Sequence, residues 1–349
     1  MGTTPSPSSG HDPGNPAADD PAVRITELSL GFLQSAALAT VARLDVADHL
    51  ADGPRTPEQL AATLKVSADH LGRVLRLLAT RGVFREDDEG AFHLTPAADL
   101  LRTDSPDSLR DGVLMLQSDL FWTPALRMGD TVRAGATVFD EIHGMPFFDY
   151  LARNPEAGEA FDTGMASYSR TENDAIAGAY AFPDAGTVVD VGGGHGGLLC
   201  QVLLRNPGLS GILYDQEGVL PGHVLDRPEL AGRWELQPGD FFASVPAGAD
   251  IYLVKRILHD WSDEESVRIL KNCRSGMTEN SRLLVIDAVI PPGNTPHTGK
   301  LLDVLMMTSL NGRERTEADF RELVATAGLK VTGVHPTPST LSIVEAVVE

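Results

Sequence analysis

Apolar positions along the chain follow two different patterns, and the change between them divides the sequence. From Val23 to about residue 180, apolar residues recur at the spacing of three or four that is typical of amphipathic helices. From about residue 186, short apolar runs alternate with helical segments. Repeated strand–helix units predict an α/β fold, with a mostly parallel sheet covered by helices on both faces.

The N-terminal part contains a tail and then a compact unit with clear boundary signals. Residues 1–22 contain no Leu, Ile, Val or aromatic residue, and such a composition predicts a disordered tail. Beyond it, Ile25, Leu28, Phe32 and Leu33 fall on one helical face. Thr56 with Gln59 forms a capping box, Ser67 caps a second helix that ends at Gly82, and the turn DDEG joins VFRE to AFHL as a hairpin. Two helices followed by a hairpin are the outline of a winged helix.

We expect four segments, namely a tail at 1–22, a winged-helix-like domain at 23–110, a helical linker at 111–180 and a sheet domain at 181–349. The sheet strands are expected at TVVDV, GILYD, RWELQPGDFF, DIYLVK, RLLVIDAVI, LKVTGVH and LSIVEAVV. Ser262 with Glu265 and Thr316 predict two further helix starts. Because only PTPST joins the last two strands, one of them must run antiparallel.

Charge and cysteine content narrow the class of protein. A formal net charge of −21 argues against binding to nucleic acid or to an anionic membrane, because both need clustered Lys and Arg. Cys200 and Cys273 lie in helical segments and are expected to be buried apolar residues. No apolar run approaches the roughly 18 residues of a membrane span, and no signal peptide is recognisable. A cytoplasmic protein is the expectation.

The stretch VVDVGGGHGG combines a glycine loop with an acidic residue. Gly192, Gly194 and Gly197 satisfy G-x-G-x-x-G, while Leu198 in place of Lys argues against a P-loop. The strand–turn–helix context predicts a Rossmann-like sheet with its ligand at this turn. The carboxylate of Asp190 would repel a pyrophosphate and would attract the sulfonium and amino groups of S-adenosylmethionine. An NAD-dependent oxidoreductase therefore remains only a minor alternative.

Two later strands supply further candidates for holding that ligand. Asp215 ends the second strand, where a carboxylate holds ribose hydroxyls. Asp240 is suited to accept from an adenine amino group, with Phe241 able to stack on the ring. The alternative for Asp240 is a turn or cap residue.

Candidate catalytic residues follow the fourth and fifth strands. His259 lies just past DIYLVK on the ligand side and is suited to act as a general base on a phenol. Asp287 and Glu314 are candidates to orient its imidazole, with a strand-end cap and a surface salt bridge as their alternatives. Asp260 either binds the substrate or begins the next helix. The spacing of His, Asp and Glu does not require a metal.

DVGGGHGG, LYD, GDFF, LVKRILHDW and GRERT together resemble the class I S-adenosylmethionine-dependent O-methyltransferases of the plant caffeate and bacterial antibiotic-tailoring type. The resemblance covers nearly everything after the tail and implies a homodimer formed through the N-terminal helices. It implies His259 as the base, flanked by Asp287 and Glu314. Asp287 stands where plant members usually have Glu, so its contact with His259 is left open. The residues that the resemblance places around the cofactor are Gly192, Asp215, Asp240, Phe241, Lys255, Met165, Ser169 and Trp261.

The substrate is expected to be a small phenolic natural product, such as an antibiotic or aromatic polyketide intermediate. Phe147, Phe148, Met165, Met306 and Met307 are candidates to line an apolar slot, although each is also an ordinary core residue. Two other functions stay open. One is a winged-helix regulator, which the acidic DDEG turn disfavours, and the other is a cofactor-binding relative with altered chemistry.

Overall fold

The computed structural model describes residues 20–349 and divides into two compact units, the first ending at Ser105 and the second spanning Pro106–Glu349. Residues 1–19, which hold most of the predicted tail, lie outside the described residues. Helix α1 (Pro21–Ser29) begins two residues before the predicted Val23, so the predicted end of the tail at residue 22 is wrong. Asp20 caps this helix by accepting from the Ala22 N–H at 2.8 Å, and Pro21 occupies its first turn.

The first unit has the order of elements that the sequence predicts. After α2 (Gly31–Arg43) and α3 (Val46–His49), the predicted capping box of Thr56 and Gln59 starts α4 (Pro57–Leu64), and Ser67 caps α5 (Ala68–Ala79). Strands β1 (Phe84–Glu86) and β2 (Phe92–Leu94) form the predicted antiparallel hairpin, and α6 (Pro96–Asp99) follows.

Five large apolar side chains from α1, the junction at Leu30 and the first turn of α2 lie largely at the surface of this unit. They are between 45% and 72% exposed and comprise Ile25, Leu28, Leu30, Phe32 and Leu33. Among the described residues, no single helix is long and apolar enough to cross a membrane. The pair α1 and α2, bent by 40°, meets that test by length and composition only.

A helical layer forms the first part of the second unit. It consists of α7 (Arg110–Leu116), α8 (Asp119–Leu126), α9 (Met128–Ala134), α10 (Phe139–His143), α11 (Phe147–Arg153) and α12 (Pro155–Ala179). Helix α15 (Gly299–Ser309), although far away in sequence, packs on α8 and α9. Phe121, Phe139, Phe147 and Met306 belong to the core of this layer.

The second unit contains a seven-stranded sheet in the order β5-β4-β3-β6-β7-β9-β8. The strands are β3 (Gly186–Val191), β4 (Leu209–Asp215), β5 (Trp234–Pro238), β6 (Ile251–Lys255), β7 (Arg282–Asp287), β8 (Leu329–Pro336) and β9 (Ser342–Val348). Strand β9 runs antiparallel to both β7 and β8, which confirms the antiparallel strand predicted from the short PTPST connection. Strand β5 ends at Pro238, so the prediction that the strand continues through GDFF is wrong.

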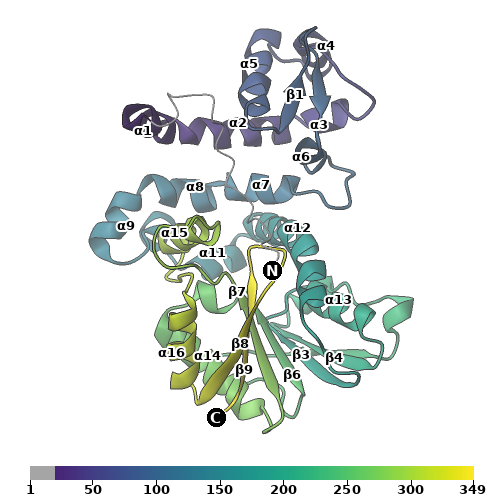
Figure 1. Cartoon of the computed structure of the whole chain (residues 1–349), viewed down its shortest axis with the longest axis vertical. Helices are drawn as coiled ribbons and strands as arrows, with labels where there is room; N and C mark the ends of the chain where they lie inside the picture. The colour runs from purple at the N-terminus through teal and green to yellow at the C-terminus, as the bar shows by residue number, and fades with distance from the viewer. Residues whose placement is uncertain (1–19) are drawn as a thin grey trace, which may run out of the picture. The chain divides into compact units, whose positions relative to one another are not determined.

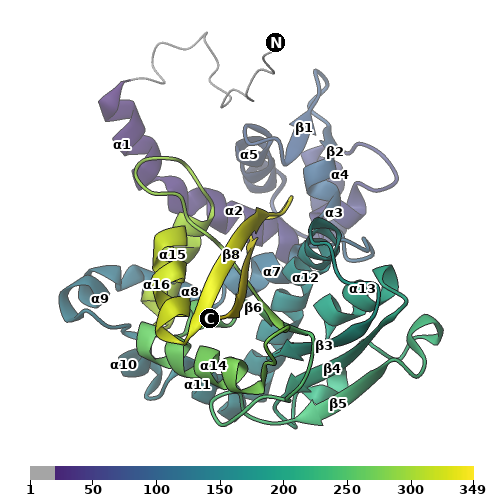
Figure 2. The same ribbon diagram turned by 60° about the horizontal axis from the view of Figure 1, so that its bottom comes forward.

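Helices lie on both faces of the sheet (Figures 1 and 2). Alternating side chains of the strands build two cores, one on each face. Val188 and Leu253 face α12 and α13 (Gly197–Arg205), whereas Val189 and Val254 face α14 (Asp263–Gly276) and α16 (Glu317–Thr326). The helices packed on both faces hold the sheet so that the carboxyl ends of the parallel strands β3, β4, β6 and β7 meet at the same edge of the sheet. Cys200 and Cys273 are free and buried in these cores, as predicted.

Candidate active site

The glycine loop after β3 turns tightly over the side chain of Asp190. Gly192, Gly194 and Gly196 have φ values of 66°, 58° and 74°, in the left-handed region that glycine adopts without strain. A Cβ atom at Gly193 would lie 2.6 Å from Asp190 Cγ. The backbone therefore approaches this carboxyl group more closely than any residue with a side chain could.

Asp190 is a buried acid without a complete set of partners. Its side chain is 1% exposed, and Oδ2 makes no hydrogen bond with any residue that the structure describes. Burial raises its pKa to about 7, against the opposing influence of the Lys255 ammonium. A buried carboxylate that lacks partners is stabilised by a positively charged ligand. The residues present thus fit the amino and sulfonium groups of S-adenosylmethionine.

Asp215, at the end of β4, is oriented by the same loop. Its Oδ2 accepts from the Gly194 N–H at 2.8 Å, and its Oδ1 accepts from the Gln216 N–H at 2.7 Å. Burial raises the pKa of this carboxyl group, while the two hydrogen bonds oppose the rise. Each oxygen keeps further acceptor capacity, as a carboxylate that holds two ribose hydroxyls requires.

The segment after β5 combines a turn residue with an aromatic ring. Asp240 is exposed, and its Oδ1 accepts from the Phe242 N–H at 2.8 Å, so it caps the turn that ends the strand. Phe241 lies beside the glycine loop, where its ring would be 3.3 Å from a Cβ atom at Gly192. Trp261 packs edge-on against Phe242, with 4.7 Å between ring centroids.

A buried charged cluster connects α12 to the end of β6. Lys255 Nζ donates to Ser169 Oγ at 3.0 Å and lies 3.4 Å from Glu172 Oε2. Glu172 also pairs with Arg256, which has a φ of 53°. Burial lowers the pKa of Lys255 to about 8, although Glu172 opposes the change. Lys255 and Ser169 are candidates named from the sequence, whereas Glu172 is not. Glu172 lies one helical turn after Ser169, on the same face of α12.

His259 lies in the short helical turn Leu258–Asp260 that follows β6, where it is 5% exposed. Its Nδ1 is 2.9 Å from Glu314 Oε1, and its Nε2 is 3.4 Å from Asp260 Oδ1. Burial alone would lower the pKa of the imidazole, but the carboxylates of Asp260, Glu314 and Asp287 outweigh it and raise the pKa to about 9. The arrangement gives a strong base whose Nδ1 is occupied by Glu314.

Asp287 ends β7 inside the protein and is 0% exposed. Neither of its carboxylate oxygens forms a hydrogen bond within the described part of the chain. Burial raises its pKa to about 7, while the His259 charge opposes the rise. Of the two predicted orienting carboxylates, Glu314 forms a hydrogen bond with the imidazole, and Asp287 acts on it only through its charge.

The aromatic and methionine candidates differ in how accessible they are. Phe148 is 37% exposed and stacks on Trp261, with 5.7 Å between centroids and 24° between planes. Met165 and Met307 are half-buried, whereas Phe147 and Met306 lie within the helical core. Phe148 of α11 and Trp261, which directly follows the turn of His259, therefore form an accessible flat surface beside the base.

Comparisons with known proteins agree with this geometry. A family model described as the O-methyltransferase domain matches residues 126–330, and an O-methyltransferase dimerisation domain matches residues 26–104. A phenazine O-methyltransferase of Lysobacter antibioticus is 39% identical over 326 residues, which cover 92% of this chain and 95% of that protein.

Among solved structures, the chain is likewise similar to methyltransferases. A methyltransferase of calicheamicin biosynthesis with bound S-adenosylhomocysteine has a TM-score of 0.89 and 45% identity, covering 94% of this chain and 98% of that chain. An O-methyltransferase of neocarzinostatin biosynthesis, in complex with S-adenosylmethionine and 2-hydroxy-5-methyl naphthoic acid, has a TM-score of 0.73 and 34% identity, covering 91% and 96%. Within the described residues, no group of three or more His, Cys, Asp or Glu side chains could hold a metal ion.

Proposed function

This chain belongs to the S-adenosylmethionine-dependent O-methyltransferase family, and we propose that it methylates a phenolic hydroxyl of a small aromatic natural product. The observation that carries this proposal is the buried pair of His259 and Glu314, 2.9 Å apart, at the sheet edge that also bears the glycine loop. A base at that position removes the proton from a hydroxyl group as it attacks. The catalytic and binding roles below extend this proposal to individual residues.

The chain's own residues hold and orient the methyl donor. When bound, S-adenosylmethionine supplies a methyl group on a positively charged sulfonium that is already activated for transfer. Asp190 faces positive charge, Asp215 accepts from the ribose hydroxyls, and Gly192 and Gly194 allow close backbone approach. The remaining proposed contacts come from Met165, Ser169, Asp240, Phe241, Lys255 and Trp261. Alignment of this kind can lower the free-energy barrier of an in-line displacement by several kcal/mol.

His259 is proposed to accept the phenol proton at Nε2. Glu314 accepts from Nδ1–H, which fixes the tautomer that leaves Nε2 free to act as a base. The imidazole pKa of about 9 is close to the pKa of a phenol, which is about 10. The proton therefore moves from the phenol to the imidazole at small cost in free energy. Glu314 and Asp287 stabilise the imidazolium that results.

An aromatic substrate fits the exposed ring surface and the acidic group beside the base. Phe148 and Trp261 offer a flat apolar face, Met306 and Met307 lie on α15, and Asp260 is within 3.4 Å of the base. The relatives and structures described above carry names that refer to phenazine, calicheamicin and a naphthoic acid. By analogy, we assign this chain to the tailoring of an antibiotic or aromatic polyketide intermediate.

The dimerisation domain supports homo-oligomerisation of the chain. We assign the contact to the exposed apolar face of α1 and α2, and we place the homodimer in the cytoplasm, without nucleic-acid or membrane partners. A winged-helix regulator is not favoured, since Arg76 of α5 is neutralised by Glu86 of the hairpin at 2.7 Å. The division at residues 110 and 180 remains a prediction.

Mass spectrometry after incubation with S-adenosylmethionine and a panel of hydroxylated naphthoates, phenazines and simple phenols tests the substrate class. We expect a gain of one methyl group on a ring hydroxyl, and O-methyl ethers of the same rings should not react. Methylation confined to aliphatic alcohols or amines would contradict the proposal.

A further inference from the structure

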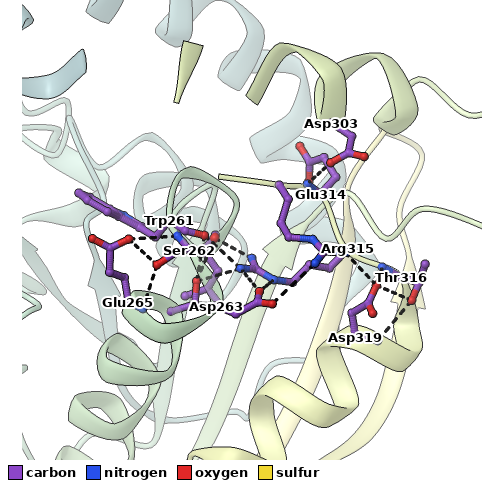
Figure 3. A network of polar contacts seen from close by, with 12 residues as sticks. Trp261, Ser262, Asp263, Glu265, Asp303, Glu314, Arg315, Thr316 and Asp319 are labelled. Atoms are coloured by element: carbon purple, nitrogen blue, oxygen red, sulfur yellow. Dashed lines mark hydrogen bonds and ion pairs between the residues drawn. The ribbon is translucent and has the colours of Figure 1, made fainter. Parts of the chain in front are cut away.

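Arg315 is a buried arginine whose side chain is directed at the loop that carries His259 (Figure 3). It is 1% exposed. Its Nη1 donates to the Leu258 carbonyl at 2.7 Å, and its Nη2 donates to the Trp261 carbonyl at 3.1 Å. The same guanidinium pairs with Asp263 Oδ1 at 2.7 Å and donates to Ser266 Oγ at 3.2 Å. One side chain thus joins both ends of the loop to the first turn of α14.

The backbone next to Arg315 holds the middle of the same loop. The Arg313 N–H donates to the His259 carbonyl at 2.8 Å. A Cβ atom at Gly312 would lie only 1.9 Å from that carbonyl oxygen, so this contact requires glycine. Residues 312–315 therefore contact residues 258–261 along their whole length, from Leu258 through the base to Trp261.

Arg315 is itself fixed on its other side. Its carbonyl accepts from the Ile290 N–H at 3.0 Å, just beyond β7. The preceding N–H, that of Glu314, donates to Asp303 Oδ1 at 2.9 Å (Figure 3). Glu314 and the loop of His259 are thus held relative to each other by two adjacent residues of one segment.

We propose that Arg315 is a positioning residue, whose guanidinium fixes the loop backbone so that the His259 imidazole keeps its hydrogen bond to Glu314. The inference rests on the proposed function only for its catalytic consequence. Within the turn Leu258–Asp260, the Asp260 and Trp261 N–H groups donate to local carbonyls at 3.1 and 3.3 Å. Ser266 Oγ also donates to the Leu258 carbonyl at 3.1 Å, so Arg315 shares this acceptor with the first turn of α14. Arginine suits this task because its planar fork of five N–H donors reaches several acceptors at once, which the three donors of lysine on one nitrogen cannot do.

Arg315→Lys is the variant that isolates geometry, because it keeps the positive charge and removes the fork. Arg315→Met removes both, and Arg321→Met serves as a control, since Arg321 is 48% exposed and pairs with Glu317 within α16. The primary measurement is an NMR titration of the His259 imidazole in each purified full-length variant, which requires no methyl acceptor. Unfolding temperature is recorded alongside it.

In the parent protein and in Arg321→Met, we expect an imidazole pKa of about 9. In Arg315→Lys it should fall toward the ordinary value of about 6.5, because Glu314 no longer meets Nδ1. Turnover should fall by about 10²-fold, as for a reacting group displaced by about 1 Å, while the Kd for S-adenosylmethionine stays within about twofold. A folded Arg315→Lys protein with the parent imidazole pKa would overturn the inference. Arg315→Met, which removes both the charge and the fork, repeats the same test, and the parent imidazole pKa in that folded variant would overturn it equally.

A purely structural role for Arg315 would lower the unfolding temperature without moving the imidazole pKa, which would also count against positioning. His259→Ala separates this inference from the proposed function. If His259→Ala stays active while Arg315→Lys lowers the imidazole pKa, the base assignment fails and the positioning role stands. If His259→Ala is inactive while Arg315→Lys matches the parent in both turnover and imidazole pKa, only the positioning role fails.

Discussion

The imidazole of His259 and the carboxylate of Glu314 meet through one hydrogen bond of 2.9 Å in a buried site, although 55 residues separate them in the chain. The bond occupies Nδ1 and leaves Nε2 as the nitrogen that can take a proton. Asp260 and Asp287 add negative charge around the same ring, which is why its pKa lies above the ordinary value.

The pH dependence of turnover follows from this environment. The imidazole must be neutral to accept a proton, and its pKa is raised to about 9, so the neutral fraction increases with pH. We expect kcat/KM to rise roughly tenfold per pH unit from about pH 6 and to level off near the imidazole pKa. Initial rates in buffers of constant ionic strength measure this, and a flat profile over that range would be inconsistent with His259 as the base.

Glu314 and Asp287 should differ in their effects on catalysis. Glu314→Gln removes the negative charge that favours Nδ1–H and adds an amide that can donate to Nδ1 instead, so the imidazole can adopt the wrong tautomer and we expect turnover to fall by about 10²-fold or more. Asp287→Asn removes only a charge, so it should lower the apparent pKa of the base and reduce turnover by less than about tenfold. Measuring the pH–rate profiles of both variants side by side tests this difference. Equal losses of turnover would mean that Asp287 contacts the His259 imidazole directly in the working enzyme.

The glycine loop offers a steric test of the cofactor site. Gly193→Ala places a Cβ atom 2.6 Å from both Asp190 Cγ and Leu213 Cδ1, so the loop must shift. We expect the calorimetric Kd for S-adenosylmethionine to weaken by at least about tenfold, whereas Gly218→Ala, with nothing within 4 Å, should leave it unchanged. Equal affinity in both variants would show that the ligand does not depend on this loop.

The apolar face of α1 and α2 should mediate self-association. Leu28 is 72% exposed, and Leu28→Glu places a charge in the proposed contact, so we expect a shift from dimer to monomer in light scattering. Thr63→Glu adds the same charge at an exposed position of α4 and should remain dimeric. A Leu28→Glu protein that keeps the parent mass would locate the interface elsewhere.

Local chemistry determined most elements that could be predicted from sequence. The capping boxes at Thr56 and Ser262 and the N-cap at Thr316 lie where predicted, because each depends only on residues within one helical turn. Two boundaries were wrong for equally local reasons. Asp20 and Pro21 form a helix start within an apparently unstructured tail, and Asp240 turns the chain where a strand was expected to continue.

Relationships between distant segments were less predictable. The sequence indicated that Asp287 and Glu314 would approach His259, since each follows an element ending at the same sheet edge. Which of them forms the hydrogen bond depends on side-chain length and on how residues 312–315 are held against the loop, and neither is visible in a linear pattern. Glu172 and Arg315 were missed for the same reason, because their partners lie 84 and 57 residues away.

Methyl transfer by His259→Ala, measured together with its affinity for S-adenosylmethionine, tests the base assignment most directly. We expect the Kd for S-adenosylmethionine to stay within about twofold of the parent value, while turnover of the phenol falls by about 10²- to 10⁴-fold at neutral pH. A variant that binds S-adenosylmethionine normally and keeps near-parent turnover at neutral pH would contradict the assignment of His259 as the general base.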